Sequence, residues 1–431
     1  MNSQNRTFRS YIMKRNKVIV IGAGFAGLQF LQSIEKDRFD ILLIDRLNHH
    51  QFQPLFYQVA TSQLEPSSIS FPLRHIFQDR KDIRIRMTSV RKILHEEHLI
   101  RTDIGDFPYD FLIIATGAQT NFYGNKEIAT HALKLKTTHE AITIRNTVLT
   151  NFERLLSTTD EEEKKRMLNI IIVGAGPTGV ELSGAFAEIK KYVLPKDFQR
   201  IDFSRLRVIL IEGGAEPLSA MSAESRKASA VYIKELGVEL MLNTTVSSYD
   251  GKKVVLSDGK EIPSSLVIWA AGVTGNWLDG IAEDMRSKGN RIAVDRLNQV
   301  QGMHGVYAVG DIAYMETPLY PKGLPQLANV AINQAQNLAK NLKKDADIND
   351  WKAYEYKDLG SMATIGRNKA VVDLPFVKFK GYFAWFVWMF LHLMLILRVK
   401  NKLIIFINWT SNYFTRNSSL RLILSEKEDE F

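Results

Sequence analysis

The sequence contains no cysteine. Disulfide bonds and thiolate metal sites are therefore excluded, and so is every mechanism that needs a redox dithiol or a cysteine nucleophile. Proline-rich, serine-rich and repeated stretches are also missing, which argues against a disordered chain or a solenoid. No metal site is expected, because His95 and His98 flank two glutamates without a third ligand nearby. The rest is an ordinary folded composition over 431 residues, enough for two or three domains.

Acidic residues are scarce in the C-terminal part of the chain. Between Arg367 and Arg421 there are nine Lys or Arg residues and one acid, Asp373, whereas the whole chain carries a net charge of only +9. These basic residues alternate with apolar runs, while a nucleic-acid surface needs basic residues spread over polar faces. The pattern therefore predicts that residues 375–421 contact an anionic lipid surface, and it predicts no nucleic-acid partner.

A continuous apolar run long enough to cross a bilayer is missing as well. Tyr382–Leu397 is sixteen residues long and apolar except for His392, whereas a crossing needs about 20 residues. Half of the six tryptophans lie within or just after this run, and basic residues interrupt the apolar pattern. Such helices are typical of shallow insertion among lipid headgroups. The alternative is that this segment is a helix buried against a homodimer partner. Lipid insertion and dimerisation are compatible with each other.

Glycine-rich turns are the clearest feature that is present. An apolar β-branched run, Lys17–Ile21, leads directly into the turn Gly22–Gly27, which reads GAGFAG. A helical pattern follows, and a second run, Ile41–Ile44, ends at Asp45. In such a turn the first glycine permits the bend, the second lets the backbone approach a pyrophosphate, and the third lets helix and strand pack closely.

The same order of elements recurs later in the chain. Ile170–Val173 leads into the turn Gly174–Gly179, which reads GAGPTG, and after a helical pattern Val208–Ile211 ends at Glu212. Two complete units predict two dinucleotide sites. A carboxylate at the end of the second strand accepts hydrogen bonds from ribose hydroxyls, and no Lys or Arg adjoins Glu212 to bind a 2′-phosphate. The second site is therefore predicted to prefer NADH to NADPH.

The predicted fold class is α/β, with two Rossmann-like dinucleotide-binding domains and a C-terminal membrane-associating helical segment. Residues 17–120 and 292–372 are assigned to the first dinucleotide-binding domain, which is discontinuous. Residues 121–291 are assigned to the second, and 373–431 to membrane docking and dimerisation. Short alternating runs at 93–102 predict an antiparallel hairpin. A helix is expected at Ala141–Leu156, and a solvated charged turn at Asp160–Arg166.

Several segments resemble the type II, non-proton-pumping (alternative) NADH:quinone dehydrogenases of the two-dinucleotide flavoprotein superfamily. The resemblance runs from about residue 17 to about residue 414. The segments that carry it are residues 45–61, 176–182, 269–273, 307–311, 323–335 and 360–371.

The resemblance implies that the first glycine unit binds FAD, that the second binds NADH, and that a quinone binds nearby. The residues implied for FAD are Gly22, Gly24, Phe25, Ala26, Gly27, Asp45, Arg46, Gln53, Thr116, Gly117, Gly310, Asp311, Gln326, Leu327 and Ala328. Those implied for NADH are Gly174, Gly176, Pro177, Thr178, Gly179, Glu181, Glu212, Ala271 and Gly272. Those implied for the quinone are Gln58, Ala331, Gln334 and Lys369.

Three of these residues are implied to be catalytic: Glu181, Gln334 and Lys369. For Glu181 the alternative is an acid favoured only by the dipole at the start of a helix. For Lys369 the alternative is a solvated or lipid-facing lysine. This chain also departs from the family at Asn333, where glutamine is usual.

The predicted activity is FAD-dependent oxidation of NADH with two-electron reduction of a membrane quinone, without proton pumping. Hydride transfer needs nicotinamide and flavin rings stacked about 3–3.5 Å apart, and it needs no side-chain acid or base. Without cysteine, the glutathione, lipoamide and thioredoxin reductases and the sulfide:quinone oxidoreductases are excluded. The enzyme is expected at the inner face of a respiratory membrane, on the cytoplasmic side of a bacterial plasma membrane. The alternatives are a soluble NADH-dependent reductase for a ferredoxin-like carrier and a non-enzymatic flavoprotein scaffold.

Overall fold

The structure is a computed structural model that describes residues 15–343, 350–416 and 420–423. The described residues form two compact units, each assembled from three stretches of chain. Unit 1 draws on Met1–Asn48, Pro72–Gly117 and Gly275–Tyr356. Unit 2 draws on His49–Phe71, Ala118–Thr274 and Lys357–Phe431.

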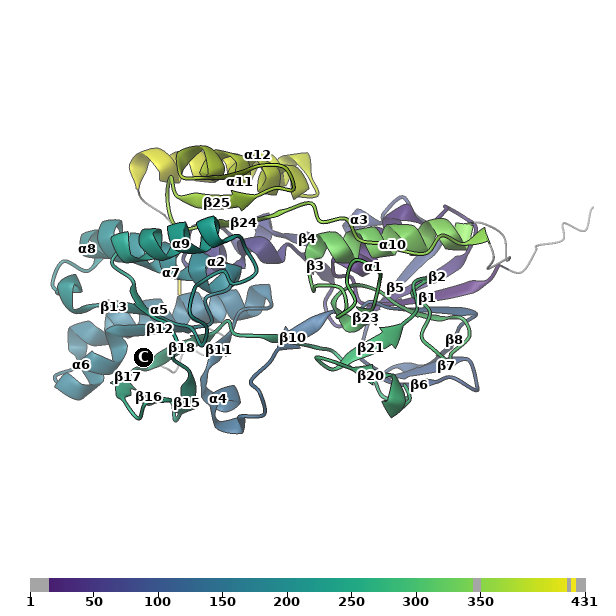
Figure 1. The fold of residues 1–431 in the computed structure, drawn as a ribbon, viewed down its shortest axis with the longest axis horizontal. Helices are drawn as coiled ribbons and strands as arrows, with labels where there is room; N and C mark the ends of the chain where they lie inside the picture. Colours follow the sequence, from purple (N-terminus) through teal and green to yellow (C-terminus); the bar gives the residue numbers. More distant parts are fainter. Residues whose placement is uncertain (1–14, 344–349, 417–419, 424–431) are drawn as a thin grey trace, which may run out of the picture. The chain divides into compact units, whose positions relative to one another are not determined.

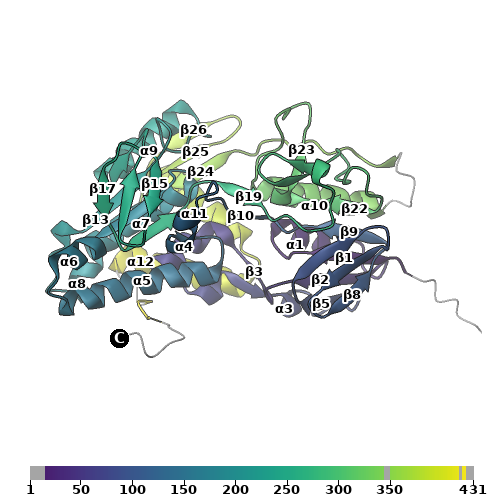
Figure 2. The ribbon, with the colours of Figure 1, turned by 90° about the horizontal axis from the view of Figure 1, so that it is seen from below.

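Unit 1 is built on a five-stranded parallel sheet in the order β22-β9-β1-β2-β5 (Figure 2). Its central strands are buried almost without interruption, as expected for a parallel sheet covered on both faces. The strands are β1 (Lys17–Ile21), β2 (Asp40–Asp45), β5 (Ile83–Met87), β9 (Phe111–Ile114) and β22 (Val306–Ala308). Helices α1 (Phe25–Ser33) and α10 (Ala328–Lys343) pack against each other. The first glycine turn joins β1 to α1, which confirms the predicted order of elements.

Two smaller sheets complete unit 1. The predicted hairpin is confirmed, because β6, β7 and β8 form an antiparallel sheet around the His95–His98 turn. A second small sheet has the order β20-β21-β23. The remaining elements are α3 (Leu73–Ile76), β6 (Val90–Leu94), β7 (Leu99–Thr102), β8 (Gly105–Pro108), η4 (Glu283–Met285), β20 (Arg286–Ser287), β21 (Arg291–Val294), η5 (Gly310–Ile312) and β23 (Ala313–Met315).

Unit 2 contains the second five-stranded parallel sheet, in the order β11-β18-β12-β13-β14. The second glycine turn joins β12 to the helix α7, again as predicted. The strands are β11 (Leu133–Lys134), β12 (Asn169–Val173), β13 (Arg207–Ile211), β14 (Glu239–Met241) and β18 (Leu266–Trp269). The helices are α4 (Lys126–His131), α5 (Thr138–Ser157), α6 (Glu161–Met167), α7 (Pro177–Tyr192), α8 (Leu194–Asp197) and α9 (Ala223–Glu235). An antiparallel sheet lies beside them: β15 (Val246–Tyr249), β16 (Lys253–Leu256) and β17 (Glu261–Pro263).

The helix predicted at Ala141–Leu156 is confirmed as α5, but the charged turn predicted at Asp160–Arg166 is wrong. That segment is the helix α6, capped by Asp160, whose Oδ1 accepts a hydrogen bond from Glu162 N at 2.9 Å. Three glutamates occupy its first turn and three basic residues its last turn. Charges placed in this way complement the helix dipole, so a segment without an apolar stripe still forms a helix.

The C-terminal elements pack as part of unit 2. Helix α11 lies against β25, and α9 and α7 lie against the opposite side of the β24–β25 pair (Figure 1). Asp373 fastens this layer, because its Oδ1 accepts a hydrogen bond from Ser225 Oγ at 2.7 Å and its Oδ2 one from Ser222 N at 2.6 Å. The elements are β24 (Ser361–Thr364), β25 (Ala370–Asp373), β26 (Lys378–Lys380), α11 (Tyr382–Leu395) and α12 (Val399–Thr415).

The segment 49–71 also packs in unit 2, with α2 lying against α5 and α7. Its elements are β3 (His49–Gln51), η1 (Gln53–Leu55), α2 (Phe56–Ala60), η2 (Pro66–Ser68) and β4 (Ser70–Pro72). Elsewhere in the chain, β10 (Ala118–Thr120) pairs with β19 (Val273–Gly275) in a two-stranded sheet. The domains predicted from the sequence separate the chain according to the nucleotide that each part binds, and this division stays a prediction. Packing groups the chain differently, since 49–71 and 357–372 belong with the second glycine unit.

Candidate active site

The first glycine turn has the shape that a bound pyrophosphate requires. Gly22 has φ +101°, and a Cβ there would lie 2.3 Å from the carbonyl oxygen of Ala115. A Cβ on Gly27 would lie 1.8 Å from the carbonyl oxygen of Gly22, so strand and helix meet without room for a side chain. A Cβ on Gly24 would meet no atom within 4 Å. The open side of the turn therefore lies at the N-terminus of α1, where backbone N–H groups favour a phosphate.

The second glycine turn repeats this geometry. Gly174 has φ +100°, and a Cβ there would lie 2.7 Å from Ala271 Cα. A Cβ on Gly179 would lie 1.9 Å from the carbonyl oxygen of Gly174, whereas one on Gly176 would meet no atom within 4 Å. Pro177, at the start of α7, and Thr178 are both exposed beside the open glycine. Both turns thus fit a dinucleotide.

The acids at the ends of β2 and β13 bind the backbone of their glycine turns. Asp45 Oδ2 accepts a hydrogen bond from Ala23 N at 2.6 Å. Glu212 Oε2 accepts one from Ala175 N at 2.7 Å, and its Oε1 accepts one from Gly214 N at 2.7 Å. A carboxylate oxygen has two lone pairs, so these contacts orient each acid and leave acceptor capacity for ribose hydroxyls. The ribose contacts expected of Asp45 and Glu212 stay predictions.

The other residues implied for FAD in unit 1 form the rim around the first turn. Gly310 has φ +77°, and a Cβ there would lie 3.0 Å from Ala26 Cβ and 3.3 Å from Ala331 Cβ. Gln334 is buried, and its Oε1 accepts a hydrogen bond from Gly310 N at 2.9 Å. The Gln334 amide therefore holds the Gly310 turn in place, which is a positioning role. Its predicted catalytic role finds no support in these contacts.

The loop before α10 and the turn after β9 are fastened in the same way. Gln326 Nε2 donates to the carbonyl oxygen of Asp311 at 2.9 Å, and Thr116 Oγ1 donates to the carbonyl oxygen of Asn276 at 2.8 Å. Gly117 has φ +66°. The remaining predicted FAD residues lie at the surface of their units: Phe25 and Ala328 are half-buried, and Arg46, Gln53 and Leu327 are exposed. Gln53 belongs to unit 2.

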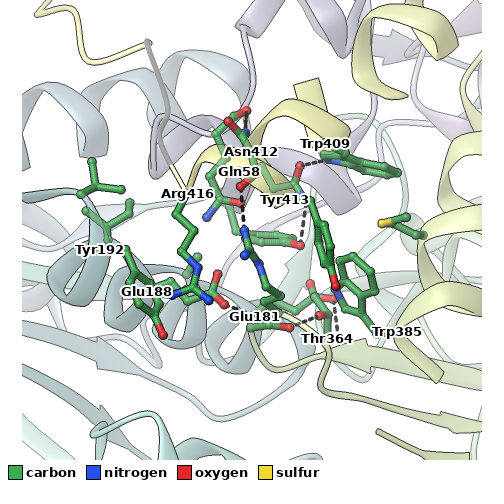
Figure 3. A pocket seen from close by; sticks show the side chains of 18 of the residues that line it. Gln58, Glu181, Glu188, Tyr192, Thr364, Trp385, Trp409, Asn412, Tyr413 and Arg416 are labelled. Carbon is green, nitrogen blue, oxygen red and sulfur yellow. Dashed lines mark hydrogen bonds between the residues drawn. The ribbon is translucent and has the colours of Figure 1, made fainter. Parts of the chain in front are cut away.

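A cavity of about 910 Å³, part of it open to solvent, lies within unit 2 (Figure 3). Its walls come from α2, α7, the turn after β24, and the helices α11 and α12. Two predicted site residues, Gln58 and Glu181, line it. Aromatic side chains from the C-terminal helices close one end, where Figure 3 shows Trp385 and Trp409.

Glu181 is a buried carboxyl group in this cavity. Burial raises its pKa to about 8, because an ionised carboxylate would lose its hydration. The backbone N–H of Thr364 lies 3.4 Å from Oε1, and this long hydrogen bond and the Trp388 indole lower the pKa only partly. Trp388 Nε1 is itself buried without a hydrogen-bond partner of good geometry among the described residues. Glu181 is therefore protonated at neutral pH, which a solvated helix-terminal acid would not be.

A chain of hydrogen bonds lies across the cavity from Glu181. Trp409 Nε1 donates to Gln58 Oε1 at 2.7 Å, and Gln58 Nε2 donates to Tyr57 Oη at 2.9 Å. Burial, with the nearby charges of Glu181 and Glu188, raises the pKa of Tyr57 well above its usual value. Tyr57 therefore stays a phenol, and its hydroxyl proton has no acceptor among the hydrogen bonds of the described residues.

The opposite end of the cavity is polar. Arg416 lies over the ring of Tyr192, 4.6 Å from its centroid, close to Glu188 (Figure 3). Glu188 Oε1 accepts a hydrogen bond from Arg367 N at 2.5 Å. Burial raises the pKa of Glu188, and the nearby arginines counteract this rise. The cavity therefore runs from a basic end to an aromatic end, a polarity suited to an amphiphilic ligand.

Lys369 lies elsewhere in unit 2. Its Nζ forms an ion pair with Glu235 Oε2 at 2.7 Å and lies 5.5 Å from the centroid of the Tyr232 ring. It does not line the described cavity, where Arg367 is the basic residue from the same turn. The contacts of Lys369 are those of a partly exposed, paired lysine, so its predicted quinone role finds no support in them.

Sequence reasoning missed several residues of the cavity: Tyr57, Glu188, Arg367, Trp388, Trp409 and Arg416. The nearest signal was the concentration of tryptophan near the C-terminus, which was interpreted as lipid-facing. Trp388 in fact points inward and is 2% exposed. Ala271 and Gly272, which were predicted to bind NADH, lie beside the second glycine turn. A Cβ on Gly272 would lie 2.2 Å from Tyr123 Oη.

Comparison with known proteins agrees with this architecture. Residues 16–335 match the pyridine nucleotide-disulphide oxidoreductase family, and residues 359–417 match the NDH2 C-terminal domain. A type II NADH:quinone oxidoreductase of Mycobacterium tuberculosis is 32% identical over 95% of this chain and 90% of that protein. The chain belongs to the type II NADH:quinone oxidoreductases. An internal alternative NAD(P)H-ubiquinone oxidoreductase of Solanum tuberosum is 31% identical over 94% of this chain and 88% of its own length.

Solved structures extend the likeness of fold. NDH2 from Plasmodium falciparum, in complex with NADH, aligns over 95% of this chain and all of that chain, with a TM-score of 0.87 and 21% identity. The sulfide:quinone oxidoreductase of Aquifex aeolicus aligns over 95% of this chain and 96% of its own, with a TM-score of 0.68 and 17% identity. The absence of cysteine here separates this chain from dithiol chemistry on a shared fold.

We expect Glu212→Arg to weaken NADH and to improve the use of NADPH. The substitution replaces an acceptor of ribose hydroxyls with a cation that attracts a 2′-phosphate. Loss of about 1.4 kcal/mol corresponds to a tenfold rise in KM for NADH. Steady-state kinetics with both nucleotides measures the change. Glu153→Arg, at an exposed acid of α5 in the same unit, is the control, and an unchanged nucleotide preference in Glu212→Arg would show that the ribose is bound elsewhere.

Proposed function

We propose that this chain oxidises NADH and transfers the two electrons through FAD to a membrane quinone. The family assignment supports this activity, and the two glycine turns with their paired acids provide the two nucleotide sites. FAD would be held by the turn Gly22–Gly27, Asp45 and the Gly310 turn, and NADH by the turn Gly174–Gly179 and Glu212. When bound, FAD accepts a hydride from the nicotinamide and passes the electrons on. The residues of the chain bind and orient the two nucleotides.

The quinone occupies the cavity of unit 2 in this proposal. A quinone has a flat polar ring and an apolar tail, and the cavity offers polar groups beside Trp385, Trp388 and Trp409. Tyr57 has a hydroxyl proton to donate to a quinone carbonyl, and Gln58 holds the Tyr57 oxygen in position. The observation that carries the assignment is the buried carboxyl group of Glu181 in the same cavity.

Reduction of a quinone by NADH takes up one proton from solution, because the quinol carries two hydrogens and the hydride of NADH accounts for one of them together with both electrons. A carboxyl group with a pKa of about 8 holds a proton at neutral pH and releases it to a stronger base. Glu181 therefore supplies one proton to a quinone oxygen, and it is refilled from solvent through the open side of the cavity. Gln58 keeps its predicted quinone role in this proposal and Glu181 its predicted catalytic role, but here Glu181 serves the quinone and not the NADH site implied for it. Gln334 has the positioning role described above.

We expect Glu181→Gln to slow quinone reduction about a hundredfold, the lower range for loss of a general acid. Reduction of a water-soluble dye that accepts electrons alone should be nearly unchanged, which separates proton delivery from NADH oxidation. In the unsubstituted enzyme the quinone rate should fall as pH rises through about 8, where Glu181 loses its proton. Glu181→Gln should lose this step in the pH profile. Glu283→Gln, which removes an exposed carboxylate, is the control; retention of the step in Glu181→Gln would contradict the role.

The C-terminal helices present an apolar face that suits a lipid surface. Only Ala384 and Trp388 of α11 and Ile405 of α12 are buried. The large exposed side chains recur at helical spacing: Phe383, Phe386, Phe390 and Met394 on α11, and Val399, Leu403, Phe406, Ile407 and Phe414 on α12. Basic residues border this face, which attracts anionic headgroups. We therefore propose peripheral docking at the cytoplasmic face of a respiratory membrane. In the described part of the chain, no helix is long and apolar enough to cross a membrane.

We expect the double substitution Phe383→Glu and Phe390→Glu to reduce binding to vesicles of anionic lipid about a hundredfold, since each charge resists insertion by roughly 2.5–3.5 kcal/mol at most. Cosedimentation with vesicles measures this effect. Leu319→Glu with Ile104→Glu, at exposed positions of unit 1, provides the matched control. If the double variant still sediments with vesicles but changes from dimer to monomer, the face is a dimer interface and the docking proposal fails.

A further inference from the structure

A tyrosine beside the second glycine turn has a backbone conformation that its side chain disfavours. Tyr123 has φ +52°, in the left-handed region. Gly124 follows it with φ +81°, and Asn125 N donates to the carbonyl oxygen of Phe122 at 3.0 Å. Phe122–Asn125 is therefore a tight turn with positive φ at both central positions, where glycine, asparagine and aspartate are the usual residues.

The turn is fixed at both of its ends. Phe122 packs against Trp269, with ring centroids 5.6 Å apart. Asn125 Oδ1 accepts a hydrogen bond from Ile128 N at 3.0 Å and so caps the helix α4. Because both ends are held by the surrounding structure, Tyr123 stays in a conformation that a tyrosine in a free loop rarely adopts.

Packing within the chain does not explain why this position is a tyrosine. Tyr123 is 69% exposed, and its hydroxyl forms no hydrogen bond in the part of the chain that the structure describes. An exposed ring gains little from burial, whereas glycine would adopt the same φ without strain. Strained residues that bring no gain to the fold are concentrated at ligand sites.

The ring of Tyr123 lies where a nucleotide on the second glycine turn would reach it. Its hydroxyl occupies the space that a Cβ on Gly272 would take, and Gly272 is itself exposed. The preceding residue, Ala271, lies directly against the turn, because a Cβ on Gly174 would be 2.7 Å from its Cα. Since Tyr123 and Gly272 are both open to solvent, there is room for a ligand beside the ring.

The order of the strands decides which half of NADH lies nearest the ring. Strand β12 leads into the glycine turn, with β13 on one side of it and β18 on the other. Glu212, at the end of β13, is the acid proposed for the adenosine ribose. A dinucleotide crosses the edge of such a sheet from one side of the central strand to the other. The nicotinamide half therefore belongs on the side of β18, which leads to Gly272 and so to Tyr123.

We propose that Tyr123 binds the nicotinamide half of NADH, with its ring packed against the nicotinamide riboside and its hydroxyl donating a hydrogen bond to it. The inference rests on the proposed NADH site and adds a residue to it. The fixed turn holds the ring before the nucleotide arrives, so little conformational freedom is lost on binding. This role also explains Gly272, because a side chain there would displace the Tyr123 hydroxyl.

Calorimetric titration of the full-length, FAD-loaded protein tests the role without turnover. NAD+ and ADP are the probes, because both contain the adenosine half and only NAD+ contains the nicotinamide half. We expect Tyr123→Gly to weaken NAD+ binding about tenfold and to leave ADP binding unchanged. Tyr123→Phe, which keeps the ring, should weaken NAD+ binding less. Asp37→Gly, at an exposed residue of unit 1 with φ +61°, is the matched control and should change neither.

Two results of this titration would overturn the proposal. Unchanged NAD+ binding by Tyr123→Gly would show that the ring does not touch the nucleotide. Equal weakening of NAD+ and ADP would show a general disturbance of the site instead of a lost contact with the nicotinamide half.

Thermal unfolding separates a ligand contact from a packing contact. In nucleotide-free buffer Tyr123→Gly should unfold at the same or a higher temperature than the unsubstituted protein, because glycine relieves the strain of the turn. NAD+ should raise the midpoint of the unsubstituted protein more than that of Tyr123→Gly. A lower midpoint without nucleotide, with an unchanged response to NAD+, would show that the ring only supports the fold, and would contradict the proposal.

The variant Glu212→Arg separates the role of Tyr123 from the NADH site on which it rests. If the site is correct, this variant should bind both NAD+ and ADP more weakly, since both contain the adenosine ribose. Weakening of both by Glu212→Arg, with no effect of Tyr123→Gly, would leave the site in place and refute the role of Tyr123. No effect of Glu212→Arg on either probe would refute the site and the role together.

Discussion

The burial of one carboxyl group against the C-terminal layer is the constraint on which the proposed chemistry of this protein depends. Glu181 belongs to the nucleotide-binding helix α7, yet its surroundings are completed by β24 and α11, far away in sequence. Because this layer excludes water, the carboxyl stays neutral at a pH where a solvated glutamate is charged. The same layer carries the exposed apolar face proposed for lipid docking. One arrangement therefore connects the proposed proton donor, the cavity and the apolar face.

The nucleotide sites follow from a simpler constraint, which is the close approach of backbone to backbone. At Gly27 and Gly179 a single added carbon would overlap a carbonyl oxygen, and at Gly24 and Gly176 the space is open. The closed positions fix strand and helix, and the open positions face the ligand. A side chain would disturb the packing of strand against helix at the closed positions and the approach of a ligand at the open ones. The glycines at both turns are therefore explained by packing as much as by binding.

These local features could be predicted from the sequence because each unit is encoded within one continuous stretch, Lys17–Asp45 and Asn169–Glu212. The strand, turn, helix and acid of both units are confirmed, and so is α5. The cavity could not be predicted in this way, because Tyr57, Glu181 and Trp409 come from three separate stretches that meet only in the folded unit. The place of a residue within a family segment also did not predict its contacts. Lys369 lies in a segment typical of the family, but it pairs with Glu235, while Arg367 reaches the cavity. The helix α6 was missed because its stability comes from capping and charge order, which leave no apolar periodicity.

The central claim is that a quinone binds in the cavity of unit 2, beside Glu181. Photolabelling with an azido-quinone during NADH oxidation, followed by peptide mapping, tests this claim most directly. The account predicts label in the peptides that contain Tyr57–Gln58 and Trp385–Trp409, and protection of both by excess unlabelled quinone. Protectable label confined to other peptides, with these two unmodified, would contradict it.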